Sequence, residues 1–284
     1  MTVDDTRFVD DFARCAADGA PSLIGPTGPP DELFGVRLIG HSNGMAVADC
    51  TKPLGDPNPG WLMPMIDLLL ARATLDPTRS HSCITLRIDL NVNPAALAAA
   101  DTVRGIGRSG FSAGAVASSN CKIRCKAAEF GAAELVATGS GMFMFDVAEL
   151  PHPSEAALAR RHSSTLVELL GLDIEVTPGT TVMPTGVTTA NPSGVVHGGA
   201  QVAALCAAVA EAARAHAATD MSIVHVSAEF MRPLSAFAEP LNICIRHRRR
   251  GRTIATYDAE LVTPDREVGT RAHLTLARDT VLAP

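Results

Sequence analysis

Aromatic residues and long apolar runs are scarce in this sequence. One Trp, one Tyr and nine Phe are spread over 284 residues, too few for the aromatic platforms that stack on single-stranded nucleic acid. No apolar stretch reaches the roughly 18 residues that a membrane helix needs, and the acidic N-terminus has no apolar core of signal-peptide length. We therefore expect a cytoplasmic protein that does not insert into a membrane.

The chain also lacks an excess of basic residues. Lys and Arg total 24 against 30 Asp and Glu, which gives a formal net charge of −6 and a pI near 5.8. Such a chain has no general attraction for phosphate backbones, so we expect no nucleic-acid partner. The seven cysteines are scattered, and only Cys121 and Cys125 lie close together, without a second ligand pair. This pattern predicts reduced thiols and no metal site.

An internal repeat is the most informative feature of the sequence. Residues 32–38 (ELFGVRL) are echoed by residues 168–174 (ELLGLDI). An apolar helical segment follows in both places, at residues 60–75 and 199–213, and then a strand-like run that ends at a proline. The prolines, Pro94 and Pro233, are 139 residues apart, and the helices align at the same offset. Agreement over two elements indicates two copies of one unit.

Each copy predicts an antiparallel sheet wrapped around a helix, an α+β fold. The first helix is apolar nearly all round, as a helix inside a curved sheet must be. Its Pro64 is tolerated only in the first turn, which places the helix start near Gly60. The predicted parts are an N-terminal extension (1–30), a first unit (31–146), a linker (147–164) rich in proline and polar residues, and a second unit (165–284).

A glycine-containing loop precedes the second apolar helix and reads NPSGVVHGG over residues 191–199. A loop that leads into a helix start presents free N–H groups and the positive end of the helix dipole. Such a place can polarise a carbonyl oxygen as it becomes an oxyanion. His197 could be a functional residue of such a place or simply a structural histidine at a helix start. The loop alone does not decide between these two interpretations.

This loop resembles the Asn-x5-His-Gly-Gly motif of hotdog-fold thioesterases of the PaaI type. The resemblance implies that the chain is a double hotdog, two tandem units forming an internal pseudo-dimer. In that family a carboxylate nine residues after the histidine, on the helix, acts as general base or nucleophile. Here that position is Cys206, but its counterpart in the first unit is Asp67. Conversely, Asn58 stands in the first unit where the second has His197.

The two units are therefore complementary, and the family resemblance implies one composite site. Asn191, His197 and Gly198 of the second unit would meet Asp67 of the first, whereas the mirror-related site with Asn58 and Cys206 would be inactive. The resemblance also places a water-binding hydroxyl on the first strand-like run, at Thr85 or at Ser82. Asp67 could instead have a structural partner, but an acid among so many apolar neighbours is costly unless something holds or uses it. Cys206 is expected to be plain core.

Arginines gather at residues 246–252 (RHRRRGR), the strongest charge cluster of an acidic chain. One interpretation is a solvated hairpin turn. The other is a coenzyme A site, in which Gly199 and the guanidinium groups hold the substrate, since Arg suits phosphate geometry. The members of this predicted site are Gly199, Arg248, Arg249, Arg250 and Arg252.

Two further motifs lack the context that their chemistry needs. Residues 105–110 (GIGRSG) spell a dinucleotide fingerprint, but no apolar strand precedes them. Residues 110–114 (GFSAG) spell a nucleophile elbow, but the repeat aligns them with the turn near Gly251. We expect a hairpin there.

The expected function is hydrolysis of an acyl-CoA to the free acid and coenzyme A, with no cofactor other than the coenzyme A of the substrate. One alternative is an enoyl-CoA hydratase-like enzyme, whose hotdog relatives carry Asp-x4-His on one loop; here Pro192 stands where that Asp is needed. Another is a non-catalytic acyl-CoA-binding protein, because one of the two sites has lost its acid. The identity of the acyl group and any further homo-oligomer stay open.

Overall fold

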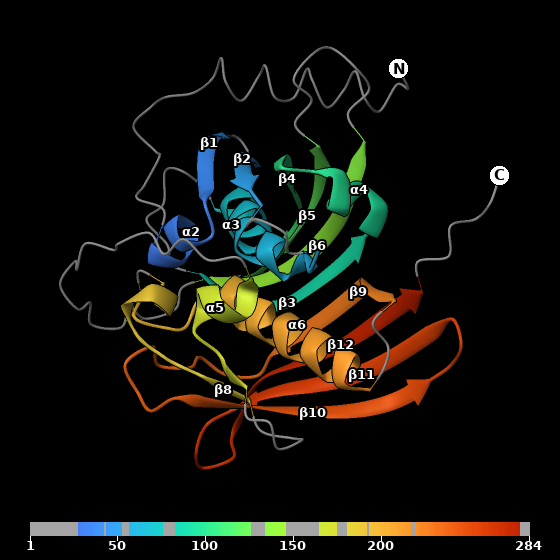
Figure 1. Ribbon diagram of the computed structural model, residues 1–284. Coiled ribbons are helices and arrows are strands. Elements are labelled where there is room, and N and C mark those ends of the chain that lie inside the picture. Colours follow the sequence, from blue (N-terminus) through green and yellow to red (C-terminus); the bar gives the residue numbers. More distant parts are fainter. Residues whose placement is uncertain are drawn as a thin grey trace.

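A single antiparallel sheet of twelve strands forms the frame of the protein. The computed structural model describes residues 28–42, 44–52, 57–75, 83–125, 134–145, 165–174, 181–191, 193–216 and 220–278. The strand order is β1-β2-β4-β5-β6-β3-β9-β12-β11-β10-β8-β7. The first six strands belong to the first unit and the last six to the second, in mirrored order. Figure 1 shows the two halves, blue to green and yellow to red, meeting along β3 and β9.

Apart from one short helix after the third strand of the first unit, both units have the same succession of elements among the described residues. The first unit contains α2 (Pro29–Leu33), β1 (Val36–Ser42), β2 (Met45–Thr51), η2 (Pro59–Leu62), α3 (Met63–Thr74), β3 (Cys83–Val92), α4 (Pro94–Ala99), β4 (Thr102–Ala113), β5 (Val116–Cys125) and β6 (Leu135–Phe145). The second contains α5 (Leu166–Leu170), β7 (Asp173–Ile174), β8 (Thr181–Met183), η3 (Val187–Thr189), α6 (Gly198–Ala215), β9 (Met221–Phe230), β10 (Leu241–Arg250), β11 (Ile254–Val262) and β12 (Val268–Arg278). The predicted fold of two hotdog units is confirmed.

The repeated ELFG and ELLG segments are the ends of the short helices α2 and α5. Gly35 and Gly171 follow these helices with φ of 69° and 63°, the left-handed conformation that ends a helix and favours glycine. The strands β1 and β7 begin directly after these turns. A helix this short has almost no hydrophobic periodicity to reveal it in the sequence.

The two units are joined by antiparallel pairing of β3 with β9, in which Asp89 lies opposite Ser227. One residue bulges out of each strand at matching places, Leu86 in the first unit and Val224 in the second. The strands β3 and β9 therefore correspond at an offset of 138 residues, whereas the prolines that follow them are 139 residues apart. At this offset Ser227 is the counterpart of Asp89, so a pseudo-two-fold axis passes through their pairing.

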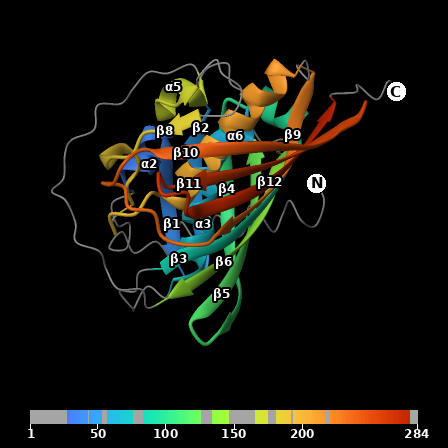
Figure 2. The same ribbon diagram turned by 90° about the horizontal axis from the view of Figure 1, so that it is seen from below.

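The helices α3 and α6 are the cores of the two units. Nearly every residue of α3 is buried, including Asp67, and α6 is buried over its first twelve residues apart from Gly198. Seen from the side of the second unit, the strands of both units form one continuous sheet (Figure 2). Pro64 lies in the first turn of α3, as predicted. No helix among the described residues is long and apolar enough to cross a membrane.

The glycine-rich segment of β4 has a packing explanation. A Cβ atom on Gly107 would lie 2.5 Å from the backbone oxygen of Leu69, so glycine there lets α3 approach the sheet. The segment that spells a nucleophile elbow is the end of β4, and the turn into β5 follows at Gly114 with φ of 60°. The expected hairpin is confirmed. The predicted linker (147–164), Ser82 and nearly all of the predicted N-terminal extension (1–30) lie outside the described residues.

Candidate active site

The loop before α6 is shaped by its own hydrogen bonds. Asn191 Oδ1 accepts from the backbone N–H groups of Ser193 and Val195, both at 3.0 Å. His197 N–H donates to the carbonyl oxygen of Thr189 (2.8 Å). These bonds fix the entry of the chain into α6 and set His197 at the N-cap position. Asn191, a member of the predicted site, thus uses its oxygen to organise the loop.

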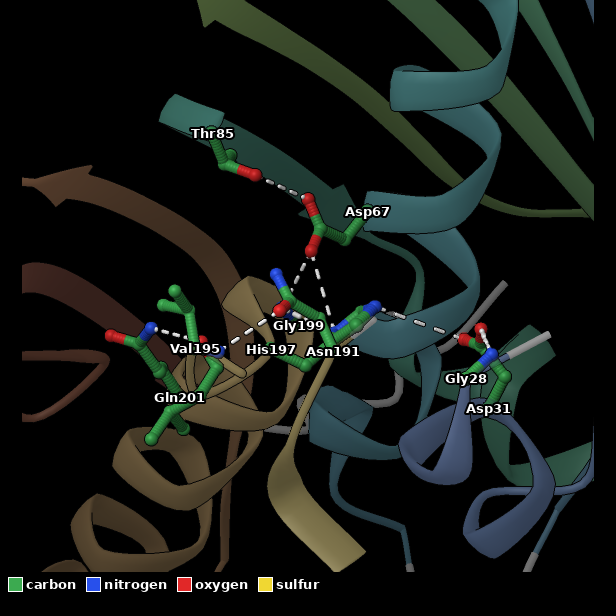
Figure 3. A network of polar contacts seen from close by, with 10 residues as sticks. Gly28, Asp31, Asp67, Thr85, Asn191, Val195, His197, Gly199 and Gln201 are labelled. Carbon is green, nitrogen blue, oxygen red and sulfur yellow. Dashed lines mark hydrogen bonds and ion pairs between the residues drawn. The ribbon is translucent and has the colours of Figure 1, made fainter. Parts of the chain in front are cut away.

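Asp67 of the first unit lies against this helix start, as Figure 3 shows. Its Oδ1 accepts from the Thr85 hydroxyl (2.8 Å), and its Oδ2 accepts from the backbone N–H of Gly199 (2.9 Å). Oδ2 also lies 3.4 Å from Nδ1 of His197. The Asp67 side chain is only 7% exposed, so these contacts replace the water that a free carboxylate would bind. The structure brings together the predicted residues Asp67, Thr85 and His197.

The two glycines of the motif have different tasks. A Cβ atom on Gly199 would lie 2.5 Å from Cα of Pro64, so this glycine lets α6 cross α3. A Cβ atom on Gly198 would lie 2.8 Å from Oδ2 of Asp67 and 3.2 Å from Oγ1 of Thr85. Within the described part of the chain, the N–H of Gly198 has no acceptor. It remains available at the positive end of the α6 dipole.

A cavity of about 690 Å³ opens over these groups and is lined by both units. A volume of this size is typical of small-molecule sites. The predicted residues that line it are Asp67, Thr85, Asn191, His197 and Gly198. Its remaining wall is largely apolar, with Leu68, Leu75, Ile84, Met144 and Phe230 among its members.

The mirror-related position has different residues and different contacts. Asn58 takes the place of His197 and caps its helix in the same way, since its Oδ1 accepts from Gly60 N–H (2.9 Å). Its Nδ2 donates to the carbonyl oxygen of Cys206 (3.0 Å). Cys206 is fully buried, and burial raises the pKa of its thiol to about 12. This thiol stays neutral, and a neutral thiol is a poor nucleophile.

The arginine cluster does not join the cavity. Arg248, Arg249 and Arg250 belong to strand β10, not to a turn as expected, and only residues 251–253 link β10 to β11. Next to them, His247 stacks on His216, the C-cap of α6, with ring centroids 6.0 Å apart. His197 caps the other end of this 18-residue helix, about 27 Å away. Figure 1 shows the end of β10 beside the C-terminal end of α6.

Four polar residues of the cavity wall were missed by the sequence reasoning. Gln201 donates to the carbonyl oxygen of Val196 (2.7 Å) and accepts from the Thr270 hydroxyl; as the one polar side chain in the buried part of α6, it could have been found. Arg72 is half-buried, and Arg232 is ion-paired with Glu267 at the exposed edge. Asp31, on α2, is 2% exposed and has no sequence signal beyond that of an ordinary helix-start acid.

Comparison with known proteins shows what the second unit is similar to. Residues 188–277 match the family model of the acyl-CoA thioesterase N-terminal domain. The second unit is similar to an acyl-CoA thioesterase domain. This match spans the motif loop, α6 and the strands β9 to β12, and it confirms the predicted enzyme class, a thioester hydrolase. None of the curated proteins matches the sequence significantly.

Solved structures extend the likeness in fold to the whole double hotdog. The tesB protein of Mycobacterium avium subsp. paratuberculosis has a TM-score of 0.58 at 12% identity, covering 88% of this chain and 99% of that one. The 12:0-ACP thioesterase from Umbellularia californica has a TM-score of 0.56 at 10% identity, covering 84% and 95%. The acyl-CoA thioesterase II TesB2 from Mycobacterium marinum has a TM-score of 0.51 at 11% identity, covering 89% and 99%. At such low identities these structures show the fold alone.

Proposed function

We propose that the protein hydrolyses acyl-CoA thioesters at one composite site between its two units. The observation that carries this proposal is the place of Asp67. A buried carboxylate from the first unit lies at the N-terminus of α6 from the second unit, beside the hydroxyl of Thr85 and in the wall of a cavity. Neither unit holds these groups alone.

The first chemical task is to stabilise the oxyanion that forms when the thioester carbonyl is attacked. Gly198 N–H lines the cavity and is free to donate, and the dipole of α6 adds a partial positive charge. A donor fixed in this place before the reaction needs no reorganisation as the charge develops. The thioester carbonyl oxygen therefore binds at Gly198.

The second task is to activate the attacking group. Thr85 donates its proton to Asp67, so the lone pairs of its hydroxyl oxygen can accept from a water molecule. Asp67 then takes a proton from that water, or its own oxygen attacks the carbonyl and water opens the resulting anhydride. His197 and Asn191 hold the loop that supplies Gly198, and the ring of His197, 3.4 Å from Oδ2 of Asp67, also positions that carboxylate. All of these groups belong to the chain, and coenzyme A enters as part of the substrate.

The test is thiol release from a panel of acyl-CoA substrates, with the absorbance of an enoyl-CoA followed in parallel. We expect free coenzyme A with the wild type and a strong loss of kcat in His197→Asn. This variant should fold, because Asn58 already caps the equivalent helix start of the first unit. His225→Asn, on the outer face of the sheet at the unit boundary, is the matched control and should keep full activity.

Two results would overturn the proposed function. Binding of acyl-CoA without thiol release would identify a binding protein, and loss of enoyl absorbance without thiol release would identify a hydratase. A single turnover in ¹⁸O-labelled water tests the covalent route. If water opens the anhydride at the Asp67 carbonyl, the label appears in the Asp67 carboxylate, whereas base catalysis, like water attack at the acyl carbonyl, places it only in the product acid.

A further inference from the structure

A second buried carboxylate lies next to the site and takes no part in the mechanism described so far. Asp31 stands in the first turn of α2, and its Oδ2 accepts from Gly28 N–H (3.2 Å). Its Oδ1 has no hydrogen-bond partner among the described residues and lies 3.9 Å from Nε2 of His197. Figure 3 shows the two groups facing each other. Burying a carboxylate with one oxygen unsatisfied is costly, so its position calls for an explanation.

The tautomer of His197 explains the position of Asp31, and the hydrogen bond at Nδ1 of His197 determines that tautomer. Nδ1 accepts from Gly199 N–H (3.1 Å), so in the neutral ring Nδ1 carries no proton. The proton is then on Nε2, the atom that faces Asp31. The ring therefore lies between two carboxylates of the first unit, Asp67 on α3 and Asp31 on α2.

We propose that Asp31 is a positioning residue, which accepts the Nε2–H of His197 and holds the tautomer whose Nδ1 lone pair faces Gly199 and Asp67. This inference rests on the proposed function and adds a residue to the same site. Asp31 touches no reacting atom and acts through His197. The separation of 3.9 Å is longer than a hydrogen bond, and catalytic contacts often tighten only when substrate binds.

The internal repeat supplies an independent argument. The helix ends at Gly35 and Gly171 align Asp31 with Val167 in the second unit. The mirror-related site, where Val167 belongs, has Asn58 in place of the histidine. An amide has no tautomer that needs an acid to select it. The acid is thus present at the site that has the histidine, and an apolar residue replaces it at the site that has none. Both residues lie on equivalent short helices, so the helix itself does not require the acid.

The charges around Asp31 set the pH range in which it acts. Burial raises the pKa of Asp31 to about 6, and the charge of Asp67 adds to this increase. His197 and, more weakly, Arg72 oppose it. Cys50 also faces Asp31, but burial raises the pKa of that thiol, which stays neutral. Asp31 therefore loses its charge in mildly acidic solution, and the histidine then loses its acceptor.

The experiment compares Asp31→Asn with Glu32→Gln, which removes one charge from an exposed position of the same helix. The pH profile of kcat/KM in the wild type should fall on the acid side with an apparent pKa near 6. In Asp31→Asn, kcat should fall by roughly 10–100-fold, the usual effect of losing such an orienting partner, with KM within about twofold, and this acid limb should move. Glu32→Gln should superimpose on the wild type.

A double-mutant cycle with His197→Asn separates a positioning role from a structural one. If Asp31 acts through the ring, Asp31→Asn should add no further loss of kcat in the His197→Asn background. An equal loss in both backgrounds, or an unchanged pH profile in Asp31→Asn, would overturn the proposal.

The wild-type chain offers a test that needs no altered Asp31. Ring ¹⁵N resonances of His197, assigned by their absence in His197→Asn, should report the Nε2–H tautomer in neutral solution. The Nδ1–H tautomer would refute the proposal. This readout does not depend on turnover, so it stays informative even if thiol release is never observed and the proposed function fails.

Discussion

Replacement of Asp67 by Asn should separate catalysis from folding at this site. In the folded chain Asp67 accepts two hydrogen bonds, from the Thr85 hydroxyl (2.8 Å) and from Gly199 N–H (2.9 Å). The Asn oxygen can accept from Gly199, and its NH₂ group can donate to Thr85, whose hydroxyl rotates to accept. The Gly199 N–H and the Thr85 hydroxyl each keep a hydrogen-bond partner in the variant. We therefore expect the free energy of unfolding to change by no more than about 1 kcal/mol.

The effect on turnover should be far larger. An amide can neither take the proton of water nor attack the carbonyl, and a positioned base is worth roughly 10²–10⁴-fold in rate. This corresponds to about 2.7–5.5 kcal/mol in the activation free energy. Steady-state thiol release gives kcat, and thermal unfolding followed by circular dichroism checks the fold.

Cys206→Ala is the matched control for this variant. Cys206 is the counterpart of Asp67 at the mirror-related position, and burial raises its pKa to about 12, so no thiolate is available there. Asn58 bonds to the backbone oxygen of Cys206 and keeps this bond in the alanine variant. We expect kcat to stay within about twofold of the wild type, because no reacting group is removed. Loss of turnover in Cys206→Ala with tolerance of Asp67→Asn would refute the reasoning and point to thiol chemistry.

Three further predictions follow from the described contacts. Thr85→Val should lower kcat by about 10-fold or more, because it removes a hydroxyl from the proposed base and water, whereas Thr85→Ser should restore most of the rate. Asp31→Asn should gain stability relative to the wild type as pH rises. The pKa of Asp31 is raised from 3.8 to about 6, so the folded chain binds more protons than the unfolded chain between these pH values. Above pH 6 the ionised group therefore lowers the free energy of unfolding of the wild type by up to about 3 kcal/mol. Chemical denaturation at pH 4 and pH 8 measures this difference between the wild type and the variant. Replacing Arg249 and Arg250 with Ala should leave KM for acyl-CoA unchanged, since both lie at the far end of α6 from the cavity, and a raised KM would restore their predicted role in binding coenzyme A.

The repeat made much of the fold predictable from the sequence. Two apolar helices and two strand-like runs at nearly constant offset fixed the number of units and their element order. The composite site was implied by the family resemblance together with this comparison, because His197 and Asp67 each occupy a position whose partner copy lacks the matching residue. Hydrophobic pattern and motif spacing are local properties, so the sequence alone carries them.

The sequence did not show every residue that lies at the boundary of the two units. Asp31 resembles a helix-capping acid, and its approach to His197 depends on how α2 docks against the loop before α6. The arginine cluster was linked with the substrate through its charge alone. In the structure it lies beside the C-terminal end of α6, whereas the cavity lies at the N-terminal end of that helix. The strand offset is one less than the helix offset because Ser227 follows Cys206 by 21 residues whereas Asp89 follows Asp67 by 22. The prolines return to an offset of 139 because β9 reaches its proline one residue later than β3. Sequence spacing does not reveal where such an extra residue is absorbed.

The central claim is that one thioester binds where the two units join. The most direct test is a crystal structure of Asp67→Asn with an intact acyl-CoA, since this variant should bind substrate without cleaving it. We predict one acyl-CoA per chain in the cavity beside α6, with its carbonyl oxygen roughly 2.7–3.1 Å from the N–H of Gly198 and its carbonyl carbon facing residue 67 and Thr85. A thioester bound beside Cys206 and Asn58, or held within a single unit, would contradict the composite site.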